Sequence, residues 1–165
     1  MRKKLFLVVL IITLLALTVA CSNKSQTAEE AKDKALIYGK WVSETGTLFE
    51  FTEDGRYTWY RDKDNTIDNF YKGGLEVLSG EEAMADLGIS EEEYNQTYTA
   101  YANRENIYSV RMHFEILHSE GVDKSESLNK EDYYYFMFMI SIDNEDEGIA
   151  ISMSNPMPIR VTRAN

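Results

Sequence analysis

The feature that most restricts this chain is its only cysteine, Cys21, which stands at the end of a long uncharged run. Basic residues occupy positions 2–4, and residues 5–20 carry no charge. Such a run approaches the roughly 20 residues that a membrane-spanning helix needs, and a simple cleaved signal has an apolar region of similar length. The small or β-branched residues at 18–20, directly before the cysteine, favour a third interpretation, a secretory signal with a lipid-attachment box.

This stretch resembles the signal of bacterial lipoproteins, in which a peptidase cuts just before a cysteine whose sulfur carries a diacylglyceryl group. Thr18 occupies the position at which these signals usually have leucine. The resemblance implies that residues 1–20 are removed, that Cys21 is lipidated, and that the protein is held on the extracytoplasmic face of the cell membrane. One acyl chain binds a membrane only marginally, so stable anchoring takes two or more.

Composition then excludes several classes of function. Once Cys21 carries lipid no thiol remains, so disulfides, cysteine catalysis and Cys-ligated metal are ruled out and the fold must be held by its core. Without residues 1–20, fourteen Lys and Arg remain against twenty-eight Asp and Glu, a net charge of −14. A chain that acidic repels phosphate, which argues against nucleic-acid partners and against adsorption of the folded domain to anionic lipid head groups.

The mature chain divides into a tether and one domain. Residues 22–34 are polar and small, with too few apolar side chains to offset the entropy of ordering. We therefore predict a lipid-anchored tether over 21–36, with a helix from about 28 to 37 suggested by a capping box at Thr27 and Glu30. The remaining stretch, 37–165, can bury a core sufficient for one domain.

The domain begins with β patterns. Phe49 and Phe51 alternate with polar residues, as in a half-buried strand. Residues 53–56 carry the Asp-Gly signal of a hairpin, and 57–60 return as the next strand. We predict a polar loop at 62–68 and a strand at 69–78, in which the adjacent glycines 73 and 74 mark a bulge or bend.

A helical pattern interrupts the strands over 79–104, where Ser79 and Ser90 each precede a glutamate at capping-box spacing. From Ile107 the pattern is β again, with an acidic loop at 118–132. The stretch 133–142 is apolar on both alternating faces, which is typical of a strand buried on both sides or lining a cavity. Further strands are predicted at 149–153 and 159–163.

The order of these elements resembles the lipocalin-like, or calycin-like, small barrels of bacterial lipoproteins. Gly39-Lys40-Trp41 stands where that superfamily has Gly-x-Trp on the first strand, and Arg160 or Arg163 stands where an arginine on the last strand packs over the tryptophan. The resemblance implies a mainly β fold, either an antiparallel lipocalin-like barrel or a strongly curved sheet, with two short helices. It leaves open whether eight strands close.

An arginine over an indole face gains about 0.5–2 kcal/mol, and it ties the first strand to the last so that neither edge is free. The alternative is an unrelated core tryptophan and a solvated arginine.

Aromatic and methionine side chains suggest a ligand pocket. One face of 133–142 presents four such residues, which together with two from 57–60 could line an apolar cavity: Tyr57, Trp59, Tyr133, Tyr135, Met137 and Met139. The alternative is a barrel interior completely filled by side chains.

No catalytic constellation stands out. His113 and His118 are five apart and would point to opposite faces of a strand, a poor metal site. Residues 62–68 imitate the start of a calcium loop, but Ile67 and Gly73 occupy the positions that require Gly and Glu. We therefore expect no catalytic residue, metal or cofactor.

The expected function is that of a non-enzymatic, membrane-anchored protein that binds a small apolar ligand or a cell-envelope partner. The alternative is an enzyme or inhibitor that acts on a protein or envelope substrate through the acidic loops 62–68 and 143–147.

Overall fold

The structure, a computed structural model, describes residues 36–164. The predicted signal, Cys21 and nearly all of the predicted tether and leading helix lie outside the described residues, so those interpretations stay predictions. In the part of the chain that is described, neither helix has the length and apolar character that a membrane crossing requires.

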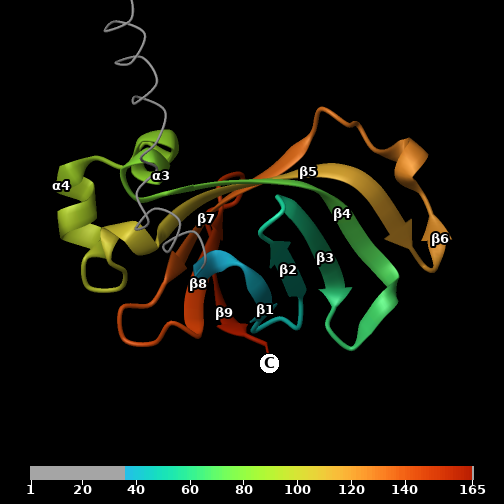
Figure 1. Ribbon diagram of the computed structural model, residues 1–165, viewed down its shortest axis with the longest axis horizontal. Coiled ribbons are helices and arrows are strands. Elements are labelled where there is room, and N and C mark those ends of the chain that lie inside the picture. Colours follow the sequence, from blue (N-terminus) through green and yellow to red (C-terminus); the bar gives the residue numbers. More distant parts are fainter. Residues whose placement is uncertain (1–35, 165) are drawn as a thin grey trace, which may run out of the picture. The chain divides into compact units, whose positions relative to one another are not determined.

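The strands form one antiparallel sheet that closes on itself (Figure 1). Each strand of the barrel pairs with its neighbour along the chain, β4 pairs with β5, and β1 pairs with β9, which completes eight strands. A short ninth strand, β6, only extends the end of β5. The strands are β1 Gly39–Ser43, β2 Leu48–Thr52, β3 Arg56–Asp62, β4 Asn65–Ser79, β5 Ile107–Ser119, β6 Val122–Asp123, β7 Tyr133–Ile140, β8 Glu147–Ser152 and β9 Pro158–Arg163. The predicted fold class is confirmed, and the barrel is closed.

The hairpin between β3 and β4 differs from the predicted polar loop at 62–68. Asp62 pairs with Asn65, so only a two-residue turn separates the strands and β4 begins at Asn65. The sequence of residues 62–68 indicates a loop because this end of the hairpin is largely exposed. A strand that is solvated on both faces shows no alternation of apolar and polar residues.

The predicted irregularity at the paired glycines is confirmed. The register between β4 and β5 shifts between Lys72 and Gly73. A Cβ atom on Gly73 would lie 1.7 Å from the carbonyl oxygen of His113, whereas one on Gly74 would have no neighbour closer than 3.7 Å. Glycine is therefore required at position 73, because the backbones of β4 and β5 approach too closely there for any side chain.

The helical insertion lies between β4 and β5, within the predicted range. It comprises α3 (Gly80–Leu87) and α4 (Glu91–Glu93), which continues into a π-helical turn at Tyr94–Tyr98, and a 3₁₀ turn at Arg104–Asn106. The Ser90 hydroxyl accepts a hydrogen bond from the Glu93 backbone N–H at 3.1 Å, as the capping pattern predicts. The Ser79 side chain makes no such cap.

Apolar side chains gather in two clusters on opposite faces of the barrel wall. The interior cluster fills the barrel and contains Trp41, Phe51, Tyr57, Val110, Phe136 and Phe138 among others. The outer cluster joins the helical insertion to the outside of β5 and β7 through Met84, Tyr94, Ile107, Met137 and Met139. The insertion therefore covers part of the outer wall, on a side of the barrel away from the β1–β2 turn (Figure 1).

Candidate functional site: the mouth of the barrel

The structure divides the six residues predicted to line one pocket. Tyr57 and Trp59 face the barrel interior, whereas Met137 and Met139 lie on the outer wall beneath the helical insertion. Tyr133 and Tyr135 share that outer face of β7, because alternate residues of a strand point to opposite sides. The two-sided burial predicted for 133–142 is confirmed, but its two faces serve different packing surfaces and do not surround one cavity.

The outer face of β7 packs against the helical insertion and is hydrogen-bonded to it. The Asp86 carboxylate, on α3, accepts hydrogen bonds from Arg111 at 2.6 Å, from the Tyr135 hydroxyl at 2.8 Å and from the Ser109 hydroxyl. The Arg111 guanidinium also lies 4.5 Å from the centre of the Tyr135 ring. Burial alone would raise the pKa of Asp86, but these three hydrogen bonds outweigh it and lower the pKa below its usual value.

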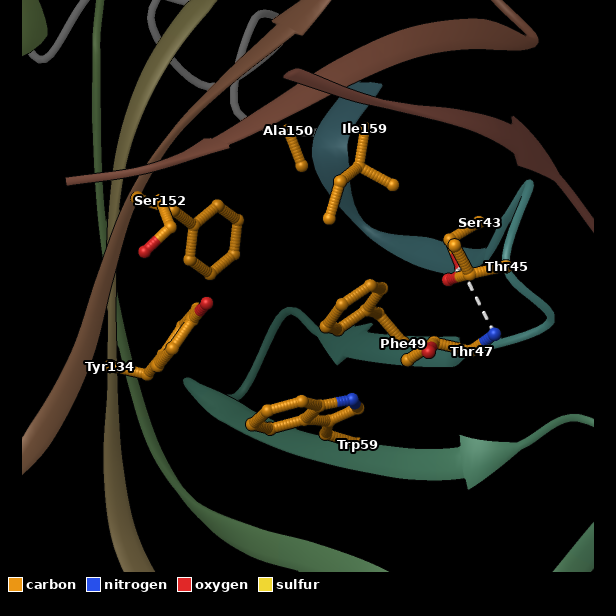
Figure 2. A pocket seen from close by; sticks show the side chains of 10 residues that line it. Ser43, Thr45, Thr47, Phe49, Trp59, Tyr134, Ala150, Ser152 and Ile159 are labelled. Atoms are coloured by element: carbon orange, nitrogen blue, oxygen red, sulfur yellow. Dashed lines mark hydrogen bonds between the residues drawn. The ribbon is translucent and has the colours of Figure 1, made fainter. Parts of the chain in front are cut away.

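A cavity of about 90 Å³ opens at the end of the barrel where β1, β3 and β8 end and where β2, β7 and β9 begin. We call it the mouth cavity. Figure 2 shows the rings of Phe49, Trp59 and Tyr134 facing it, with the residues of the β1–β2 turn on one side and Ser152 on the other. Its lining consists of Ser43, Thr45, Thr47, Phe49, Trp59, Tyr134, Phe136, Ala150, Ser152 and Ile159.

The walls of the mouth cavity are mainly aromatic. Phe49 stacks on Trp59 with 5.8 Å between ring centroids, and Trp59 stacks in turn on Tyr71 at 5.1 Å. Tyr134 tilts against Trp59 at 5.3 Å and Phe136 at 6.1 Å. These rings pack against one another and leave an apolar hollow beside them.

No charged side chain lines the mouth cavity, and its polar side-chain groups are hydroxyls and the indole N–H of Trp59. Ser43 is already engaged: its hydroxyl accepts from the Thr47 backbone N–H at 2.9 Å and lies 2.8 Å from that of Thr45. Among the described residues, Trp59 Nε1 and the Tyr57 hydroxyl are buried without a hydrogen-bond partner. Burial, with a smaller contribution from Glu115, raises the pKa of Tyr57 well above its usual value. The lining of the mouth cavity therefore suits an uncharged group, because it offers a charged group no partner of opposite charge.

The size of the mouth cavity limits what can enter. Pockets that enclose a whole drug-sized ligand measure about 300–1,000 Å³, and a cavity of about 150 Å³ accommodates benzene. At about 90 Å³ the mouth cavity admits the end of a ligand, and the rest must remain outside.

The opposite end of the barrel is closed by the predicted tryptophan and arginine. The Arg163 guanidinium lies 4.3 Å from the Trp41 ring and donates to the carbonyl oxygens of Tyr38 at 3.0 Å and Leu36 at 2.6 Å. Gly39 has a positive φ of 122°, and a Cβ there would lie 3.0 Å from Arg163 Nη1. We call this arrangement the clasp.

Of the two arginines that the sequence offered for this role, Arg163 makes the contact. Arg160 is exposed and pairs instead with Ile149 in the β8–β9 ladder. Trp41 is fully buried, and its indole N–H donates to the Ile37 carbonyl at 2.8 Å.

The remaining candidate residues do not converge. His113 Nε2 lies 3.1 Å from Glu76 Oε1 on the outer wall, and the His118 ring stacks on Phe70 with centroids 4.5 Å apart. In the acidic loop at 143–147, Asp146 pairs with Arg163 at 3.1 Å. Within residues 36–164, no group of three or more His, Cys, Asp or Glu side chains is placed to hold a metal ion.

Comparisons of the chain with protein-family models, with curated proteins and with solved structures gave no match. The eight-stranded antiparallel barrel is compatible with a lipocalin-like fold. What the candidate site can bind therefore has to be inferred from its geometry.

Proposed function

We propose that this protein is a lipid-anchored extracytoplasmic binding protein whose barrel holds the uncharged apolar end of a small ligand. The observation that supports the ligand is the mouth cavity, an aromatic hollow without charged lining. An apolar group placed there loses contact with water, which stabilises it by about 25 cal/mol per Å² of buried apolar surface. Because the hollow is small, we propose that the ligand enters end-on.

The anchor is supported by the sequence around Cys21. Expression of the full chain in a bacterium that lipidates such signals should give a membrane-bound product, cut before Cys21 and heavier than the polypeptide by the mass of its acyl chains. The Cys21→Ser variant should lose the added mass and leave the membrane fraction. An unmodified wild-type chain in the soluble fraction would refute the anchor without affecting the barrel.

Ligand binding can be tested on residues 21–165 carrying Cys21→Ser, because all eight strands of the barrel lie within the described residues. We expect an alkyl chain with an uncharged fluorophore at its head to change the emission of Trp59, which lines the cavity. The Trp59→Phe variant retains Trp41 at the opposite end, and its emission should change much less because Trp41 is farther from the probe. An equal response in this variant would place the ligand elsewhere.

Filling the cavity provides an independent test. Ala150 lines the mouth cavity and is nearly buried. Ala150→Leu should place its added carbons in the hollow, where they exclude the apolar end of the ligand. Losing the burial of that one apolar group should weaken binding by about tenfold or more. Its melting temperature should be unchanged or higher. Binding that survives this change would refute the mouth cavity as the site.

The natural ligand can then be sought by native mass spectrometry after exposure to an extract of the cell envelope. A reproducible added mass in the wild type that Ala150→Leu loses would identify the ligand class. An unmodified mass, under conditions that preserve the complex with the fluorophore, would direct the search to protein partners.

A further inference from the structure

Exposed apolar side chains are concentrated at one end of the barrel. Among residues 36–164, six large apolar side chains are exposed, and three of them lie in turns or strand ends at the end of the barrel that holds the mouth cavity. These three are Ile67 (75%), Val122 (56%) and Met157 (66%), and we call them the lip. Of the other three, Tyr133 begins β7 on the outer wall, Met153 lies near Leu87 and Met137 beneath the helical insertion, and Ile142 lies at the opposite end.

The antiparallel topology brings the lip together. The turns that join β1 to β2, β3 to β4 and β8 to β9 all lie at the end of the barrel that holds the mouth cavity, as does the β5–β6 turn. Hydrogen bonds tie these turns to one another: Lys63 N–H donates to the Gly46 carbonyl at 2.8 Å, and Gly121 N–H donates to the Asp68 carbonyl at 3.0 Å. The lip residues therefore share the mouth end of the barrel: Met157 lies two residues before Ile159, which lines the cavity, while Ile67 and Val122 lie where β4, β5 and β6 project beyond the start of β7.

Met157 is held in its exposed position by its neighbours. It stands between Pro156 and Pro158, each of which fixes its own backbone φ and restricts the residue before it to extended conformations. The two prolines therefore restrict the backbone on both sides of Met157, whose side chain is exposed. Its flexible thioether can adapt to an irregular apolar surface.

We propose that the lip docks on the uncharged surface of a lipid bilayer, so that the apolar end of the ligand passes between the bilayer and the mouth cavity without crossing water. This inference rests on the proposed function and identifies its ligand as a single-chain amphiphile. The net charge of −14 that remains after residue 20 favours neutral over anionic lipid.

The length of chain outside the barrel permits this arrangement. The clasp holds the chain at Leu36, at the end opposite the mouth, so the mouth can face the anchoring membrane only if the chain reaches back along the barrel. Residues 22–35 span up to about 50 Å when extended. The longest strand of the wall, β4, has 15 residues, or about 50 Å along its length, and because the strands of a barrel tilt by roughly 35–45° it rises about 38 Å along the barrel axis. The chain between Cys21 and the clasp is therefore long enough when it is extended.

The experiment measures transfer of the head-labelled alkyl probe from the protein, residues 21–165 with Cys21→Ser, to phosphatidylcholine vesicles that contain a quenching lipid. If transfer occurs during contact, its first-order rate rises in proportion to the vesicle concentration. If the probe first dissociates into water, the rate does not depend on vesicle concentration. We expect the first result for the wild type.

Three exposed lip residues are then replaced together, as Ile67→Ser, Val122→Ser and Met157→Ser. This variant should bind the probe as tightly as the wild type, but its transfer rate should fall about tenfold, as expected when apolar side chains that anchor a surface contact are lost, and should become independent of vesicle concentration. Ile142→Ser, which removes an exposed apolar side chain from the opposite end, is the matched control and should transfer like the wild type.

The outcomes separate the two proposals. A protein that does not bind the probe refutes the proposed function and this inference with it. A protein that binds the probe but transfers it at a rate independent of vesicle concentration, or a triple variant that transfers like the wild type, overturns the docking surface alone. Faster transfer to vesicles rich in anionic lipid would overturn the choice of a neutral surface.

Discussion

Replacing Arg163 by methionine should weaken the closure of the barrel. Methionine keeps apolar cover over Trp41 but removes the charge that lies 4.3 Å from the ring and both hydrogen bonds to the carbonyls of Tyr38 and Leu36. It also removes the ion pair with Asp146, whose side chain is 70% exposed. The clasp joins the first strand to the last, so this loss affects the seam of the barrel.

The expected magnitude follows from these contacts. A cation–π contact contributes about 0.5–2 kcal/mol, and each hydrogen bond from a charged donor contributes about 1.5–3 kcal/mol before the freed carbonyls regain water. The exposed ion pair adds less than about 1 kcal/mol. We therefore expect Arg163→Met to lower the free energy of unfolding by about 3 kcal/mol. Arg163→Lys, which keeps a charge but loses the two-pronged guanidinium, should cost about 1–2 kcal/mol.

Urea denaturation followed by tryptophan fluorescence measures this difference. Arg160→Met is the matched control, because Arg160 lies on the same strand, is exposed, and should change stability by less than about 0.5 kcal/mol. A loss below about 1 kcal/mol for Arg163→Met, or equal losses for the two variants, would show that the clasp does not stabilise the seam.

Two further predictions concern the wall and the insertion. Gly73→Ala should lower the free energy of unfolding by more than about 3 kcal/mol or prevent folding, because its Cβ would lie 1.7 Å from the His113 carbonyl oxygen. Gly74→Ala has room for its Cβ and should be tolerated in the same urea assay. Equal effects of the two substitutions would refute the close approach of the backbones. The lowered pKa of Asp86 means that its carboxylate stabilises the fold above the unfolded pKa of about 3.9 and that this stabilisation disappears as the pH falls through the folded pKa. The melting temperature of Asp86→Asn should therefore lie below that of the wild type at neutral pH and converge with it in acid; a difference that does not change with pH would contradict this.

Much of the barrel could be predicted from the sequence because its walls are half-buried. The strands around Phe49 and Val110 alternate apolar and polar residues, whereas 133–142 is a continuous apolar run of strand length, and each of these patterns predicts a strand. The extension of β4 back to Asn65 could not be recognised, since both faces of that segment meet solvent. Closure of eight strands also needed the structure, because it depends on pairings between distant segments such as β1 and β9.

The site was harder to predict than the fold. The sequence of 133–142 indicates two apolar faces but not which of them faces inward. The predicted pocket therefore combines residues of the outer face with Tyr57 and Trp59, which face the interior. The register between β5 and β7 decides which face is inward, because Phe136 and Tyr134 pair with Val110 and Met112 and so share the inward face. The role of Asp86 was missed altogether, since no local pattern connects it to Arg111, 25 residues away in the chain.

The clasp also sets the order in which the molecule can form. Its hydrogen bond between Arg163 and Tyr38 joins residues 125 positions apart, and contacts so distant along the chain form late and slowly. Until they form, the edge of β1 is unpaired and can recruit a strand from another copy. A chain that is exported as it is synthesised would thus emerge with its first strand exposed and wait for its last, and this interval, more than the stability of the finished barrel, is when it would most need a chaperone.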